Sequence, residues 1–216
     1  TLQRKESQPE IQKQEKLGGY GRVFGDRSFV AFVSTITIGM VAPLMMWTLL
    51  AVYINKYYGI PEYLYSWLPI TNALMCVLGQ YPVTMLARRL RAKTAITLGM
   101  MVYALGVGSV AIMTCFWGFW LSMVIMSMGE LILVPTGSKY VADIAPEDLR
   151  GRYMSIYWLT WGISRSAAPM VGGFLHDDIA PQAIWWGGLA IGLFSTIGLF
   201  LLSRRPEKQQ QLAPAD

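Results

Sequence analysis

The sequence has few charged residues, one histidine and two cysteines, and each shortage excludes a class of protein. Asp, Glu, Lys and Arg make up only 14% of the 216 residues, while hydrophobic residues make up 54%. A soluble domain carries about 25% charged residues, so this composition excludes a water-soluble globule. A single histidine, His176, cannot form a metal site alone, and Cys76 and Cys115 have neither the spacing of a metal-binding pair nor that of a disulfide framework.

The charged residues are gathered between long uncharged stretches. Residues 28–55, 63–87, 94–129 and 179–203 contain none. About 20 mainly apolar residues span a bilayer as a helix, so the pattern predicts an all-α membrane protein with six transmembrane helices. We expect spans at 29–54, 63–87, two within 94–139 joined by a tight turn near 115–118, 153–175 and 183–202.

The two ends of the chain are polar. We expect a cytoplasmic linker or tail over residues 1–25, the six-span bundle over 26–203 and a cytoplasmic tail over 204–216. Because the chain begins with Thr1 rather than with a methionine, we also expect it to be a piece of a longer protein.

Basic residues lie on one side of the predicted spans. The basic side holds Arg22, Arg27, Arg88, Arg89, Arg91, Lys93, Lys139, Arg150, Arg152, Arg204, Arg205 and Lys208. The links on the other side hold Lys56 beside Glu62, Asp177 and Asp178. Cytoplasmic loops are rich in Lys and Arg, so both termini are predicted to be cytoplasmic. The net charge of +5 then needs no nucleic-acid partner.

Three charged residues fall inside predicted spans, where each costs about 2.5–3.5 kcal/mol to insert. Lys139 lies near a span end and is expected to reach the interface. Glu130 and Arg165 lie near mid-depth on different spans, where they can pair. The pair is either structural, allowing both residues to be inserted, or part of a substrate or proton pathway.

An aromatic row precedes Arg165 at intervals of four residues: Tyr153, Tyr157 and Trp161. Such a row keeps its members near one helix face. It either lines a cavity for flat or cationic organic molecules or packs helices together.

Two other membrane classes find little support. Intramembrane proteolysis needs a Ser/His pair, paired aspartates or a metal motif, and no predicted span contains histidine or aspartate. A channel filter of repeated carbonyls or a ring of acids is also not evident. The sequence therefore predicts a protein that is not an enzyme, with a structural membrane subunit as an alternative.

Three motifs resemble those of major facilitator superfamily transporters. Leu86, Ala87, Arg89 and Lys93 are similar to the family loop motif G-x-L-a-D-R-x-G-r-r, although Thr84 and Arg88 replace its Gly and Asp, so the role of that Asp is not carried over. The segment PEDLRGR, residues 146–152, is similar to P-E-x-x-R. The fifth span resembles the glycine-rich antiporter motif. Pro169, Gly172 and Gly173 match it, and the small residues Ser155, Ser164 and Ala168 stand at its other glycine positions. Small residues there are expected to pack helices closely.

The resemblance covers residues 26–202 and is to the C-terminal six-helix half, most similar to drug–proton antiporters. It implies one half-bundle of two inverted three-helix repeats, facing an N-terminal six-helix half or a second bundle across a central substrate site. The implied function is proton-coupled efflux of small organic molecules by alternating access in a bacterial inner membrane. No cofactor is implied beyond the proton gradient. Uptake of a small metabolite by the same fold remains an alternative.

The resemblance and the charges suggest roles for two groups of residues. The expected proton or substrate pathway contains Glu130, Arg165, Tyr157 and Trp161. The expected cytoplasmic gate contains Arg88, Arg89, Lys93, Glu147, Asp148 and Arg150. In this gate, Arg88 or Arg89 would pair with Glu147 or Asp148 when the cytoplasmic side is closed. Exposed pairs contribute about 0–1 kcal/mol, so they would bias the gate without locking it; the alternative is that these basic residues only set topology.

The predicted topology can be tested by cysteine labelling in sealed cells. A membrane-impermeant reagent should label cysteines placed in the 58–62 and 176–181 links, and should not label a cysteine at Arg91, because the Lys and Arg excess keeps that loop inside. Labelling at Arg91 in intact cells would contradict the topology.

Overall fold

A computed structural model describes residues 19–204, and over this range the chain forms six long helices and no strand. The long helices are α3 (Arg27–Tyr58), α5 (Trp67–Ala87), α6 (Ala92–Ser109), α7 (Phe116–Ile144), α8 (Arg150–Asp178) and α9 (Ala183–Ser203). The short helix α2 (Tyr20–Gly25) precedes them, and three other short elements lie between them: α4 (Glu62–Tyr65), η1 (Val110–Ile112) and η2 (Glu147–Leu149). Most of the predicted linker, 1–18, and nearly all of the predicted tail, 205–216, lie outside the described residues.

The six long helices occur where the six spans were predicted. The turn between the third and fourth comes slightly earlier than expected, because η1 ends at Ile112 and α7 begins at Phe116. Within the described residues, five of the six helices are long and apolar enough to cross a membrane. The exception is α8, which is 29 residues long but carries Arg165 and several Ser, Thr and Tyr residues in its apolar stretch.

Local chemistry sets both ends of α3. The Asp26 side chain accepts hydrogen bonds from the backbone N–H groups of Ser28 and Phe29, at 3.0 and 3.1 Å, which satisfies two donors left free by the first helical turn. Gly59 ends the helix with a left-handed φ of 62°, a conformation that glycine adopts without steric cost. The first predicted span therefore begins and ends close to its expected bounds.

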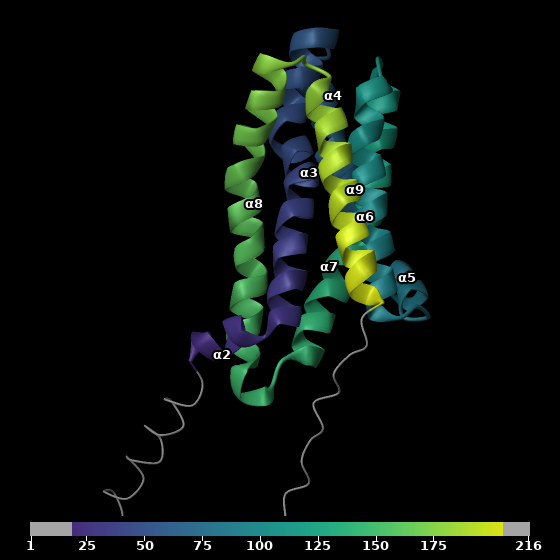
Figure 1. Cartoon of the computed structure of the whole chain (residues 1–216). Helices are drawn as coiled ribbons and strands as arrows, with labels where there is room; N and C mark the ends of the chain where they lie inside the picture. Colours follow the sequence, from purple (N-terminus) through teal and green to yellow (C-terminus); the bar gives the residue numbers. More distant parts are fainter. Residues whose placement is uncertain (1–18, 205–216) are drawn as a thin grey trace, which may run out of the picture.

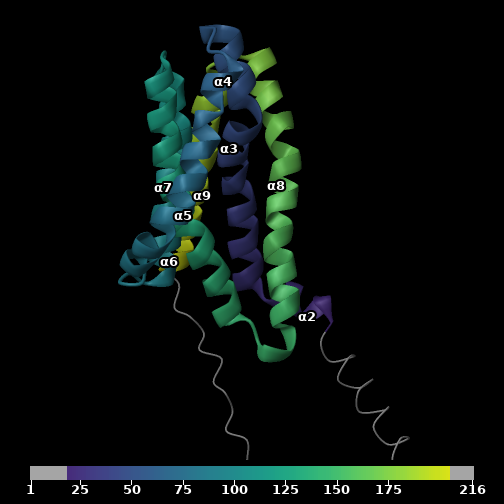
Figure 2. The same cartoon turned by 180° about the vertical axis from the view of Figure 1, so that it is seen from behind.

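The bundle is built around α3 and α6. Helix α3 packs against α8 and α9, and α6 packs against α7 and α9, while α5 lies alongside α7 (Figures 1 and 2). The first described residues and the end of α9 lie at the same end of the bundle, which we call the near end (Figure 1). The links α3–α4 and α8–α9 lie at the opposite, far end. An even number of crossings thus returns the chain to the side where it began.

Helices α6 and α7 approach closely because both present glycines to one another. A Cβ on Gly129 of α7 would lie 2.7 Å from the backbone nitrogen of Tyr103, and a Cβ on Gly106 of α6 would lie 2.6 Å from the backbone nitrogen of Met126. Backbone atoms cannot move aside as a flexible side-chain end can. The contact between these two helices therefore depends on the missing Cβ atoms.

We expect Gly129→Val to lower the free energy of unfolding by about 1–3 kcal/mol, the usual cost of overpacking a core, because the α6 backbone must shift to make room for the new side chain. The measurement is the melting temperature of the purified protein in detergent. Gly162→Val is the matched control, because nothing lies within 4 Å of a Cβ placed at Gly162 in the middle of α8. Equal melting temperatures for the two variants would contradict the close α6–α7 contact.

Candidate functional site

Glu130 of α7 is held by a side chain from α5. Its Oε2 accepts a hydrogen bond of 2.8 Å from Nδ2 of Asn72, and the same Nδ2 lies 2.9 Å from Oγ of Ser127. Asn72 and Ser127 are buried and Glu130 is half-buried. The carboxyl group is therefore placed between two helices, and a neutral amide supplies its hydrogen bond.

This contact belongs to a longer row of polar side chains between the two helices. We call the row the α5–α7 polar seam: Thr71, Asn72, Gln80, Trp120, Ser127 and Glu130. Trp120 Nε1 donates to Thr71 Oγ1 at 2.9 Å, and Gln80 Nε2 donates to the carbonyl of Leu131 at 3.3 Å. The rest of α5 is largely exposed, including Val77 and Leu78 at 78% and 73%. Directional hydrogen bonds thus join α5 to α7 at several points along its length.

The expected pair between Glu130 and Arg165 is not formed. Among the described residues no ion pair joins them, Arg165 is exposed, and Glu130 is directed to Asn72. The prediction placed the two at similar depth but could not know which helices are neighbours. In the fold α8 packs mainly against α3, whereas α7 faces α5 and α6.

The aromatic row on α8 lies largely inside the bundle. Tyr153 and Tyr157 are buried, and a Cβ on Gly137 of α7 would lie 2.5 Å from the Tyr157 hydroxyl. The Tyr153 hydroxyl donates to Asp26 at 3.1 Å, and Trp161 is half-buried. Tyr153 and Tyr157 therefore pack inside the bundle. Of the predicted pathway residues on α8, Arg165 is the one with an exposed side chain.

The small residues of α8 divide into two sets. Ser164, Ala168 and Gly172, spaced by four, are buried; Ser164 Oγ donates to the carbonyl of Thr37 in α3 at 2.7 Å, and a Cβ on Gly172 would collide with Leu49 of α3. Ser155 and Pro169 are exposed, and nothing lies within 4 Å of a Cβ on Gly173. Ser164, Ala168 and Gly172 therefore lie on the face of α8 that packs in the bundle, whereas Ser155, Pro169 and Gly173 make no close packing contact within the described chain.

The structure shows a different ion pair at the predicted cytoplasmic gate. Asp148 in η2 pairs with Arg22 of α2 at 3.5 Å, and both side chains are 57% exposed. No ion pair among the described residues joins Arg88 or Arg89 to Glu147 or Asp148, so the pairing expected when the cytoplasmic side is closed stays a prediction. Arg150 Nε donates to the carbonyl of Ala142 at 3.2 Å, so it closes the end of α7.

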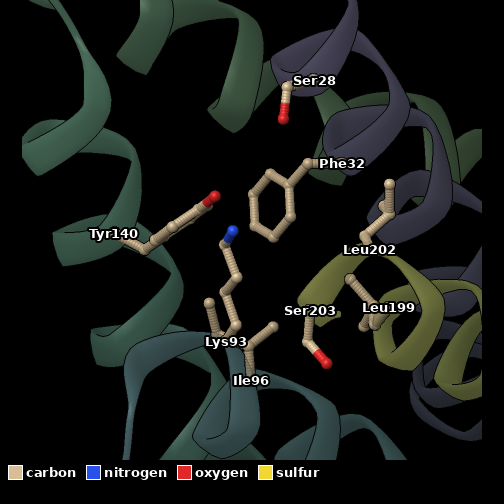
Figure 3. Close-up of a pocket in the computed structure, with 8 residues that line it drawn as sticks. All are labelled: Ser28, Phe32, Lys93, Ile96, Tyr140, Leu199, Leu202 and Ser203. Carbon is tan, nitrogen blue, oxygen red and sulfur yellow. The ribbon is translucent and has the colours of Figure 1, made fainter. Parts of the chain in front are cut away.

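Lys93 lies in the first turn of α6, just after the link that carries Arg88 and Arg89. Its side chain extends between Phe32 and Tyr140 beside a small cavity of about 20 Å³ at the near end (Figure 3). Side chains of α3, α6, α7 and α9 line this cavity. Lys93 is therefore positioned among side chains of four helices.

Comparison with known proteins identifies the family. The sequence model of the Major Facilitator Superfamily matches residues 27–216. The chain belongs to the Major Facilitator Superfamily. This membership supports a membrane transporter over an enzyme, as the sequence predicted.

Several superfamily relatives match over much of the chain. An uncharacterised MFS-type transporter, YhjO of Bacillus subtilis, is 31% identical over 58% of this chain and 31% of its own length. The multidrug resistance protein MdtH of Yersinia enterocolitica is 24% identical over 84% of this chain and 46% of its own. MdtH of Sodalis glossinidius is 25% identical over 92% and 49%. The chain therefore spans about half the length of these MdtH relatives.

A solved structure supports the fold of this superfamily member. The crystal structure of a bacterial homologue of the human lysosomal transporter Spinster, inward-facing and unoccupied, superposes with a TM-score of 0.67 at 17% identity. It covers 88% of this chain and 46% of the other. The six-helix arrangement is thus that of one half of a solved superfamily transporter.

Asn72 was not among the predicted site residues, although the sequence carries a signal for it. Asn72, Cys76 and Gln80 recur every four residues within an otherwise apolar span, which places them near one helix face. A polar face inside the bilayer needs a partner. The sequence could therefore have indicated a polar contact, but it could not name Glu130 as the partner.

The Asn72–Glu130 contact can be measured by a double-mutant cycle. We expect Asn72→Leu to destabilise the protein by about 1–2 kcal/mol, because the half-buried carboxyl loses its donor. Adding Glu130→Leu should recover part of that loss, since replacing both partners removes the unpaired group. The measurement is thermal unfolding in detergent. Strictly additive effects would contradict the coupling.

Proposed function

We propose that this chain forms one half of a secondary transporter that exports small organic molecules in exchange for protons. The substrate would bind at mid-membrane between this bundle and an N-terminal six-helix half, and the two would rock about it. The names of the MdtH relatives support multidrug efflux. Their bacterial sources and the distribution of Lys and Arg support a bacterial inner membrane, with the near end cytoplasmic.

The observation that carries the proton role is the Asn72–Glu130 contact. Among residues 19–204, Glu130 is the acid placed near the middle of a long apolar helix. An ionised carboxylate is costly away from water, and the Asn72 amide offsets part of that cost with one hydrogen bond. Water that reaches the α5–α7 polar seam would favour release of a proton from Glu130. Closure of the seam to water would favour uptake of a proton by the same carboxyl group.

Arg165 supports a polar pathway along α8. It is exposed on the isolated bundle and lies about halfway along the helix. A lipid-facing arginine at that depth costs about 2.5 kcal/mol or more. We therefore propose that this face of α8 meets the other half or the aqueous pathway. Trp161, half-buried one turn away, would lie at its edge, and the buried Tyr157 would support the helix from within.

Two other functions remain as alternatives. Uptake of a metabolite would use the same fold with the opposite net direction, and everted vesicles distinguish it by the direction of substrate movement. A non-transporting structural subunit would show no gradient-dependent flux. The names of the relatives favour export over both.

The test is Glu130→Gln in the complete protein that contains this chain. Glutamine keeps the size and can accept the Asn72 hydrogen bond, but it cannot carry a proton. We expect proton-driven efflux of a fluorescent cationic dye from cells to be lost, while dye binding to the purified protein changes little.

Glu62→Gln is the control, because Glu62 begins α4 at the far end, outside the polar seam. It should transport at the normal rate. Normal efflux with a normal pH dependence in Glu130→Gln would show that the coupling acid lies elsewhere, and loss of dye binding as well would indicate a structural defect.

A further inference from the structure

A cavity of about 190 Å³ lies at the far end of the bundle between α3 and α8, with one wall from α9. It lies apart from the α5–α7 polar seam, on the other side of the bundle. Along α8 it is also separated from Arg165, because the eight residues from Arg165 to Gly173 correspond to about 12 Å of helix. The mid-membrane pathway proposed above therefore does not account for it.

Two adjacent glycines have opposite roles in forming this cavity. Gly172 lets α8 contact Leu49 of α3, which fixes the distance between the helices. Gly173, one position on, lines the cavity, and a Cβ there would meet no atom within 4 Å. The absence of a side chain at Gly173 thus leaves open space where a larger residue would stand.

The walls are apolar and aromatic. Val52, Tyr53 and Ile184 contribute to them, and Tyr53 is buried and held edge-on against Trp185 with ring centroids 5.1 Å apart. An apolar cavity of about 150 Å³ is enough to bind benzene. The space here therefore suits a body of one or two aromatic rings.

The polar groups at the cavity are gathered at its rim. The Tyr57 hydroxyl and Nε2 of His176 are 2.7 Å apart and join α3 to α8, while Nδ1 of His176 is 2.6 Å from the Asp177 carboxylate. Asp177 satisfies the imidazole and does not line the cavity. Lys56 lines the cavity and lies 5.4 Å from the centre of the Tyr57 ring. The rim thus offers a cation, and no acid is among the residues that line the cavity.

We propose that this cavity is a second binding site, which takes a small aromatic carboxylate. The rings would lie against Tyr53 and over Gly173, and the carboxylate would meet Lys56 at the rim. The site combines an apolar wall with a few convergent polar groups, as small-molecule sites do. Its position at the far end makes it separate from the proton-coupled pathway.

The test uses 2-naphthoate with the complete protein, freed of other cysteines and carrying Val52→Cys. Val52 is 65% exposed and lines the cavity, so a bound ligand should shield the new thiol from a maleimide. We expect 2-naphthoate to slow labelling, and the neutral 2-naphthalenemethanol to do so more weakly. Lys56→Gln should weaken protection by 2-naphthoate about threefold, which is the contribution of an exposed ion pair, and leave the alcohol unaffected.

Gly173→Leu fills the cavity and should abolish protection by both compounds. Gly151→Leu is the matched control, the same replacement near the other end of α8, where a Cβ also meets nothing within 4 Å; it should leave protection unchanged. Glu130→Gln should also leave protection unchanged. Absence of protection in the parent protein, its persistence in Gly173→Leu, or its loss in Glu130→Gln would overturn the second site. Equal protection by acid and alcohol would overturn its anionic preference.

Discussion

Polar groups have no water to bind within a bilayer, and this constraint shapes both the fold and the candidate site. Backbone groups meet it by forming helices, and the side chains of α7 and α5 meet it by bonding one another. Glu130 is stable at its depth because Asn72 reaches it at 2.8 Å. Helix α5, part of the least buried of the five apolar spans, is thereby attached by the same hydrogen bond that holds the carboxyl group. A change in the protonation of Glu130 would therefore change the hydrogen bond that attaches α5 to α7.

Close packing forms the part of the bundle behind this seam. The glycine contacts between α6 and α7 and the Ser164–Ala168–Gly172 row between α8 and α3 bring backbones together without large side chains. The other faces of α5 and α8 stay exposed, and Arg165 lies on the exposed face of α8.

At the near end the chain is held by a cluster of local contacts around Asp26. Its carboxylate caps α3 and accepts the Tyr153 hydroxyl of α8, while the Phe29 and Tyr153 rings lie 4.3 Å apart. The exposed Arg22–Asp148 pair lies beside this cluster and adds little stability by itself. Part of the predicted linker, Tyr20–Gly25, is therefore helical and joined to the bundle.

The sequence by itself determined the six helices, their approximate bounds and the resemblance to one half of a transporter, because uncharged stretches of bilayer length permit few other structures. It also singled out Glu130 as a buried acid. Which side chain faces it was decided by the tertiary structure: depth along a helix can be counted from sequence, whereas the neighbour depends on how helices are arranged around one another. For the same reason the sequence treated Gly172 and Gly173 alike. The rotation of α8 against α3 made one a contact and the other the floor of a cavity.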